Sequence, residues 1–261
     1  MPRAGVSFLC CFRSHGYFAP DMPKRIVFTQ GGKGGVGKTT LALSLYDYYR
    51  TKEVAVQLVD FDAENHAKSG LNFWHPTAEK IDVQTRNGLD RLIDLSLDES
   101  GEVILADMGA GSGNVTHRWF VDIYPELEAA GIEFTSIGLV TADPGSVESI
   151  LAWSIHLKEA VSYLVVLNEL DREGEAFPYW FDSKEVHHFI RAHSPFVIKM
   201  HSRRPDLEQS ARNHGVSLAQ IADRKTKAPE LTAASLVMRA QSYRRRMDAE
   251  FEKAADILLP A

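Results

Sequence analysis

The chain has 261 residues, of which 44% are hydrophobic and 25% are charged, and its formal net charge is −6. This composition is typical of a globular domain, and the negative charge argues against a protein built mainly to bind polyanions. The sequence contains no run of about 18 apolar residues, so it predicts no membrane span.

The first 21 residues stand apart from the rest of the sequence. Their apolar run, VSFLCCF, is short and is followed by Arg13 and His15, so it does not predict a secretory signal. Met22 begins the stretch MPKRIVFTQGG, which has the form of a natural start just before a strand. We therefore expect residues 1–21 to be a disordered or mis-assigned extension, or else an interaction tail, and residues 22–261 to form a single domain. The only cysteines are Cys10 and Cys11, which fits a protein of the reducing cytoplasm.

Short β-rich runs alternate with amphipathic segments along the rest of the chain. Near-continuous apolar runs of this kind are typical of strands buried on both faces. The predicted strands span residues 25–30, 54–61, 102–108, 134–142, 163–170 and 195–200. The predicted helices span residues 39–50, 115–130, 147–160 and 231–258, the third with a serine cap in ADPGSVES. This alternation predicts the α/β class: a mostly parallel twisted sheet with helices on both faces and a ligand site at the carboxyl ends of the strands.

The segment GKGGVGKT, residues 32–39, lies between the first predicted strand and the first predicted helix and satisfies the G-x-x-x-x-G-K-[ST] motif. Backbone N–H groups of such a loop surround phosphate oxygens, the lysine (Lys38) reaches the β- and γ-phosphates, and the hydroxyl of Thr39 is offered to Mg²⁺. The residues expected to contact the nucleotide here are Gly32, Lys33, Gly34, Gly35, Val36, Gly37, Lys38, Thr39 and Thr40. The loop therefore predicts binding of ATP with Mg²⁺; a glycine-rich turn without a ligand is the alternative.

The second lysine of the loop, Lys33, needs a separate explanation. It lies outside the phosphate cradle of its own chain, yet it could reach a nucleotide held by a facing subunit. Here the sequence resembles the deviant Walker A family, the ParA/MinD-type ATPases, whose signature KGGVGKTT is matched by residues 33–40. The resemblance implies catalytic roles for Lys33 and Lys38, and a homodimer, formed on ATP binding, in which Lys33 contacts the phosphates of the partner. The alternative is a solvated loop lysine.

Two aspartates follow the second predicted strand in the stretch QLVDFDAEN, residues 57–65. A carboxylate at this place can orient the attacking water near Mg²⁺. The resemblance places the catalytic aspartate of the family on Asp62, whereas a solvated strand-end residue is the better interpretation of Asp60. The ParA branch often continues Asp-Pro-Gln at this point, where this chain has Asp62-Ala63-Glu64.

Two later strand ends extend the resemblance, which covers about residues 22–168. VILADMGAGSGN, residues 103–114, ends an apolar strand in Asp107, which is expected to hold Mg²⁺ through water as a Walker B carboxylate. Gly109 and Gly111 suit a switch that senses the γ-phosphate, and a plain glycine-rich turn is the alternative. Asn168, at the end of another strand, resembles the adenine-contacting asparagine of the family; a polar strand cap is the alternative.

The C-terminal third differs in charge from the body. Residues 183–261 hold 14 Lys and Arg against 9 Asp and Glu, whereas residues 1–182 hold 15 against 26. The basic side chains could form a patch for nonspecific DNA, or solvated helix faces balanced by acidic residues. The candidates are Arg203, Arg204, Arg224, Lys225, Lys227 and Arg244–Arg246. The acidic ending EFEKAADILLPA predicts no membrane anchor, and the loop 171–183 is either a lid or partner surface or a packed connection.

Taken with the resemblance, these features predict a dimerising ATPase switch whose slow hydrolysis is stimulated by a partner protein. Its role would be the partitioning, positioning or transfer of DNA or a protein cargo. The motif DMGAGS, residues 107–112, and the long last helix resemble TraL-type ATPases of conjugative transfer systems. The alternatives are a metabolic or maturation enzyme on the same fold, and a regulatory module that holds nucleotide without turnover. The presence of both Asp62 and Asp107 argues against the second alternative.

Overall fold

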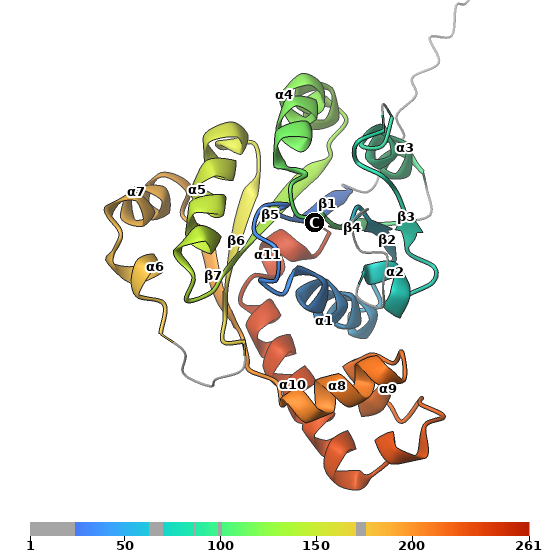
Figure 1. Cartoon of the computed structure of the whole chain (residues 1–261). Helices are drawn as coiled ribbons and strands as arrows, with labels where there is room; N and C mark the ends of the chain where they lie inside the picture. Colours follow the sequence, from blue (N-terminus) through green and yellow to red (C-terminus); the bar gives the residue numbers. More distant parts are fainter. Residues whose placement is uncertain (1–23, 63–69, 86, 99–100, 171–175, 261) are drawn as a thin grey trace, which may run out of the picture.

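A computed structural model describes residues 24–62, 70–85, 87–98, 101–170 and 176–260 (Figure 1). These residues form one seven-stranded sheet in the order β3-β2-β4-β1-β5-β6-β7, and every strand pair is parallel. The strands are β1 (Arg25–Thr29), β2 (Val56–Asp60), β3 (Glu79–Lys80), β4 (Val103–Asp107), β5 (Glu133–Val140), β6 (Ser162–Asn168) and β7 (Phe196–Met200). The predicted extension 1–21 lies outside the described residues.

Helices cover both faces of the sheet, as the sequence predicts (Figure 1). One face packs against α3 (Asp90–Leu97), α4 (Gly113–Ala129), α5 (Pro144–Leu157), α6 (Pro178–Asp182) and α7 (Lys184–His193). The other face packs against α1 (Lys38–Thr51), α2 (Leu71–Trp74), α10 (Ala234–Glu252) and α11 (Ala255–Leu258). Successive side chains of a strand point to opposite faces, so Ile26 and Phe28 join the first core and Val27 joins the second.

The parallel register gathers the polar strand ends at one edge of the sheet. Asp60 is the Cα partner of Asp107, and Asn168 is the partner of Met200. β1 lies between β4 and β5, so the loop that follows it emerges in the middle of this edge. The ligand site is therefore expected at the carboxyl ends of the strands.

The helices differ from the sequence-based expectations in two places. The predicted serine cap of the third helix is wrong: Asp143 caps α5 and accepts a hydrogen bond from the backbone N–H of Gly145. The long last helix ends at Glu252 and is followed by the short α11. Its predicted apolar stripe is buried at Ala240, Met247 and Phe251, which confirms that the stripe packs onto the molecule. Sequence reasoning did not predict the short elements α2 and β3, or α3.

A small group of helices extends from the sheet near α1 (Figure 1). It comprises α8 (Pro205–Asn213), α9 (Leu218–Ala222), the 3₁₀ turn η1 (Pro229–Leu231) and the first half of α10, and we call it the C-terminal lobe. The lobe has its own buried cluster, separate from the two cores of the sheet: Leu207, Ala211, Ile221, Ala222, Leu231, Val237 and Ala240. Because α10 runs from the lobe onto the sheet, the two parts share one continuous helix.

Candidate functional site

The phosphate loop connects β1 to α1, and its glycines are required by both conformation and space. Gly35 and Gly37 have φ angles of +74° and +96°, in the left-handed region that favours glycine. A Cβ atom at Gly37 would also lie 2.6 Å from Nδ2 of Asn168. The loop is thus shaped to bring successive backbone groups to the N-terminus of α1, where an anion is favoured.

Lys38 begins α1 and its side chain is folded against the loop. Its Nζ atom donates a hydrogen bond to the backbone oxygen of Lys33 over 2.9 Å. Burial lowers the pKa of Lys38, and the nearby carboxylates of Asp107 and Asp62 act in the opposite direction. The Lys38 ammonium therefore lies near two carboxylates, at the place where phosphate oxygens would enter.

Asp107, at the end of β4, is held by two threonines. Its Oδ2 atom accepts a hydrogen bond of 2.7 Å from Thr39, and its Oδ1 atom accepts one of 3.0 Å from Thr29. Burial raises the pKa of Asp107 to about 6, although the two threonine hydrogen bonds act against that shift. The carboxylate is therefore positioned by one threonine of the neighbouring strand β1 and one threonine of α1.

Thr39 and Asp107 fit the Mg²⁺ ion that the phosphate loop implies. Mg²⁺ prefers oxygen ligands, and a hydroxyl and a carboxylate meet here beside the loop. Among the described residues, no group of three His, Cys, Asp or Glu could hold a metal ion. The ion would therefore depend on these two side chains together with oxygens from the nucleotide and water.

The two aspartates that follow β2 lie in different environments. Asp60 is fully buried, and its carboxylate accepts hydrogen bonds from the backbone N–H groups of Asp62 and Asn72. It therefore connects the end of β2 to the start of α2, rather than being the solvated residue that the sequence suggested. Asp62 instead lines the same cavity as Lys38, and its Oδ1 lies 3.4 Å from the place of a Cβ on Gly109.

The glycine-rich turn after β4 rests directly on the start of the phosphate loop. A Cβ atom at Gly31 would lie 2.6 Å from the backbone oxygen of Gly109. Gly111 has a φ of +82°, and Ser112 donates a hydrogen bond to the oxygen of Gly109. A change in the conformation of this turn would therefore move atoms that lie against the start of the phosphate loop.

Lys33 is paired within its own chain. Its Nζ atom lies 3.0 Å from Oδ2 of Asp143, the capping residue of α5, and both side chains are about half exposed. The ammonium of Lys33 is the main reason why the pKa of Asp143 is lowered. Lys33 would have to leave this exposed ion pair to reach a nucleotide in another subunit.

Asn168 lies behind the phosphate loop. Its Nδ2 atom donates to the backbone oxygen of Val36 over 2.7 Å, and its Oδ1 atom accepts from the backbone N–H of Leu170 over 3.0 Å. The side chain is buried and is not among the residues that line the cavity, whereas Leu170 is. In this structure the amide of Asn168 thus supports the loop and its own strand end.

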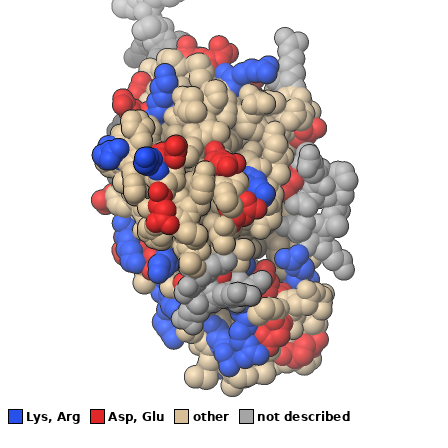
Figure 2. All heavy atoms as spheres, turned by 60° about the vertical axis from the view of Figure 1, so that its left-hand side comes forward, with Lys and Arg blue, Asp and Glu red and all other residues tan. Residues whose placement is uncertain are grey.

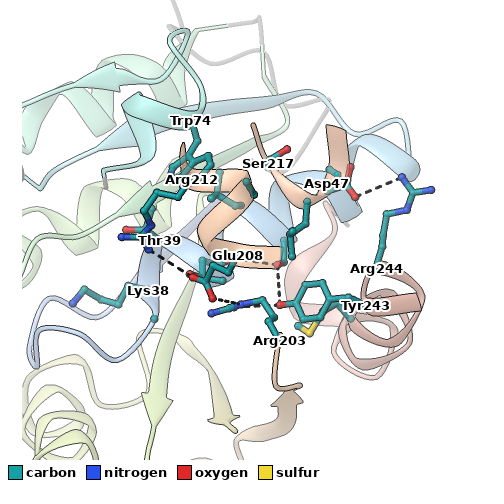
Figure 3. Close-up of a pocket in the computed structure, with 18 of the residues that line it drawn as sticks. Lys38, Thr39, Asp47, Trp74, Arg203, Glu208, Arg212, Ser217, Tyr243 and Arg244 are labelled. Atoms are coloured by element: carbon teal, nitrogen blue, oxygen red, sulfur yellow. Dashed lines mark hydrogen bonds and ion pairs between the residues drawn. The ribbon is translucent and has the colours of Figure 1, made fainter. Parts of the chain in front are cut away.

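A cavity of about 520 Å³ opens from the phosphate loop, follows α1 and reaches the C-terminal lobe (Figure 3). Sequence reasoning did not connect the lobe with the site. The segment between β7 and α8 contributes Arg203, and the lobe and α10 contribute the charged and aromatic side chains of Glu208, Arg212, Tyr243, Arg244 and Asp248. A local signal is the i, i+4 spacing of Glu208 and Arg212, which is typical of a helical ion pair.

The basic residues of the C-terminal third do not form an uninterrupted positive surface. Figure 2 shows acidic side chains close to the basic ones at the lower end of the molecule. Several of the predicted patch residues are ion-paired within the chain: Arg203 with Glu208, Arg204 with Asp206, and both Lys225 and Arg244 with Asp223. In the described part of the chain, no helix has the length and apolar character needed to cross a membrane.

Comparison with known proteins adds a family to this geometry. The family model described as the CobQ/CobB/MinD/ParA nucleotide binding domain matches residues 27–190. Among solved structures, the MinD cell division protein of Aquifex aeolicus is similar with a TM-score of 0.47 and 17% identity, over 87% of this chain and 97% of that chain. A nucleotide-binding protein of Archaeoglobus fulgidus, in complex with ADP, has a TM-score of 0.46 and 18% identity, over 81% and 91%.

A third similar structure is chloroplast FtsY from Physcomitrella patens, with a TM-score of 0.47 and 14% identity. The match covers 70% of this chain but only 60% of that chain. Comparison with curated proteins found no match.

Proposed function

The chain belongs to the CobQ/CobB/MinD/ParA nucleotide-binding family, and on this premise we propose that it is a cytoplasmic ATPase switch that dimerises when it binds ATP and Mg²⁺. The observation that carries the proposal is the meeting of Lys38, Thr39 and Asp107 at the phosphate loop. Lys38 and Thr39 line the cavity where the phosphates of a nucleotide would lie, and the buried carboxylate of Asp107 lies behind Thr39, to which it is hydrogen-bonded. We place the function in a single domain spanning residues 22–261.

Each of these residues has a distinct task in the proposed mechanism. The loop N–H groups bind phosphate oxygens, and Lys38 exchanges the oxygen of Lys33 for a phosphate oxygen. Thr39 and Asp107 would hold Mg²⁺, which compensates phosphate charge when it is bound. Asp62, which also lines the cavity, would orient the attacking water.

Lys33 would make dimerisation depend on the nucleotide. It would leave Asp143 and contact the γ-phosphate held by the partner, a group that ATP has and ADP lacks. A ligand shifts an equilibrium only through unequal affinity for its two states, so this contact would favour the dimer in the ATP state. A partner protein that stimulates hydrolysis would then return the dimer to monomers.

The cargo is proposed only as a class: DNA or a protein that is partitioned, positioned or, as in TraL-type ATPases, transferred. Arg203, Arg204 and Arg244 are already paired with carboxylates of the same chain, so we expect DNA binding to be weak. We expect it to be independent of sequence and to appear only with ATP. Fluorescence anisotropy of a labelled duplex against salt concentration measures it. Absence of binding at low salt with ATP would favour a protein cargo.

Nucleotide titration by calorimetry tests the base of the proposal. The unmodified protein should bind ATP with Mg²⁺, and Lys38→Ala should weaken the affinity by about a hundredfold or more, since charge-assisted contacts to phosphate are lost. Lys184→Ala, which removes an exposed lysine at the start of α7, is the matched control. An affinity that is unchanged in Lys38→Ala would remove the foundation of this function.

Two further variants separate the switch from its alternatives. Asp62→Ala should keep ATP affinity and lose turnover, because orienting water lowers the barrier rather than the binding energy. Lys33→Ala should bind ATP as a monomer but no longer dimerise, as measured by light scattering with a slowly hydrolysed ATP analogue. A parent protein that binds ATP without turnover would indicate a regulatory module, and ATP-dependent turnover of a second substrate would indicate a metabolic or maturation enzyme.

A further inference from the structure

Arg212 reaches the nucleotide cavity from the C-terminal lobe. It lies in the last turn of α8 and lines the same cavity as Lys38 and Thr39. Figure 3 shows its side chain on the side of the pocket where Thr39 lies, with Glu208 below it. The cavity thus has a cation on each of two walls: Lys38 from the phosphate loop and Arg212 from the lobe.

Glu208 holds Arg212 only loosely and has a second, firmer partner. The Arg212 guanidinium lies 3.6 Å from Oε1 of Glu208, whereas Nε of Arg203 donates to Oε2 over 3.1 Å. The Arg203 side chain is 9% exposed and lies against the ring of Tyr243; the Arg212 side chain is 44% exposed. If Arg212 left, Glu208 would still be paired with Arg203, so no buried charge would lose its partner.

An exposed ion pair such as Arg212–Glu208 contributes little to the stability of the folded protein, about 0–1 kcal/mol. A guanidinium and a phosphate make stronger, bidentate and charge-assisted hydrogen bonds, and both groups suit each other in shape. We propose that Arg212 exchanges Glu208 for the phosphate chain of the nucleotide held by the phosphate loop, in the same subunit. This inference rests on the proposed nucleotide binding and adds a contact from the lobe.

The exchange would couple the lobe to the nucleotide. Arg212 follows directly on Ala211, which is buried in the lobe cluster, and α8 contributes Leu207 to the same cluster. A movement of the Arg212 side chain toward the phosphates would therefore draw α8 and the lobe toward α1. The outer surface of the lobe would then differ between the nucleotide-free and the nucleotide-bound protein, as a surface that recognises a partner in one state requires.

Affinity measurements test the contact. Calorimetric titrations with ATP, ADP and adenosine compare the parent with Arg212→Ala, Arg212→Lys and the control Arg191→Ala, which removes an exposed arginine from the last turn of α7. We expect Arg212→Ala to weaken ATP binding by about tenfold, Arg212→Lys to recover part of this, and adenosine binding to stay unchanged. Equal ATP affinities of parent and Arg212→Ala would overturn the inference, as would an equal loss for adenosine and ATP.

Hydrogen exchange tests the movement and separates the two proposals. In the parent, ATP should protect both the phosphate loop and the amides of residues 207–222; in Arg212→Ala it should protect the loop alone. Protection of the lobe that survives in Arg212→Ala would overturn the inference and leave the proposed function intact. A parent that binds no nucleotide would overturn both.

Discussion

The two walls of the cavity are built from different kinds of interaction. Behind the phosphate wall, Asp107 accepts hydrogen bonds from Thr29 and from Thr39 of α1, and Asn168 donates one to the phosphate loop. Thr29, Asp107 and Asn168 are all buried. On the lobe wall, Arg212 and Arg244 are held by ion pairs that are partly open to solvent. The difference indicates that one wall keeps its geometry without a ligand, whereas the other can exchange partners at small cost.

The largest effect is expected where the phosphate wall is most tightly packed. Gly37→Ala should destabilise the protein by about 3 kcal/mol or more, because left-handed strain adds to a collision with Asn168. Gly35→Ala meets no atom within 4 Å, so only the strain remains and the loss should be about 1 kcal/mol. Urea unfolding without nucleotide measures both. Equal losses of stability for Gly37→Ala and Gly35→Ala would show that the phosphate wall moves away from an added methyl group at little cost, as we expect only of the lobe wall.

A buried histidine on α4 should make the stability of the protein depend on pH. His117, on α4, packs against Trp153 and His156, and burial, aided by His156, lowers the pKa of His117 to about 4. The unfolded chain takes up this proton near pH 6.5, so the protein should lose stability as the pH falls from about 6.5 to about 4.

His117→Phe keeps an aromatic ring of similar size and removes this titration. The variant should therefore keep about 2 kcal/mol more of its stability than the parent across that pH range. Urea midpoints measured at several pH values test the prediction, with His187→Phe on the surface of α7 as the control. Parallel pH profiles for the parent and His117→Phe would contradict it.

On the lobe wall, Arg244 joins two parts of the molecule. It lies 2.6 Å from Asp223 of the lobe and 3.9 Å from the buried Asp47 of α1. Arg244→Met should cost about 1 kcal/mol in urea unfolding, because it leaves the Asp47 carboxylate with less compensation in a partly solvated place. Asp47→Asn in the same chain should recover most of that loss. A double variant that is no better than Arg244→Met would assign the cost to the lobe pair alone.

The smallest effect on stability is expected at the exposed pair of Lys33 and Asp143. Asp143→Asn keeps an oxygen that can cap α5 but removes the charge that holds Lys33, so unfolding should not change measurably. Dimerisation on an ATP analogue should then begin at a lower protein concentration, as light scattering can show. Asp206→Asn, which breaks an exposed pair in the lobe, is the control. An unchanged concentration for Asp143→Asn would show that the pair does not restrain Lys33.

Much of the fold could be predicted because its signals are local in the sequence. The strand runs are apolar without interruption, and the motif of residues 32–39 lies between a strand and a helix, so the α/β class, the parallel sheet and the family follow from short stretches. The short elements β3 and α2 were missed because a two-residue strand and a single helical turn carry too few residues to show a period.

The sequence by itself determined which chemistry is present: glycines where φ is positive, a lysine and a threonine at the start of α1, and carboxylates at two strand ends. Only the tertiary structure decided how these groups are used, because the deciding contacts join distant residues. Asp60 is buried and accepts a hydrogen bond from the backbone N–H of Asn72 in α2, and the amide of Asn168 donates to the backbone oxygen of Val36. The lobe brings Arg212 to a cavity whose other wall lies more than 170 residues earlier in the chain, and no local pattern encodes that approach.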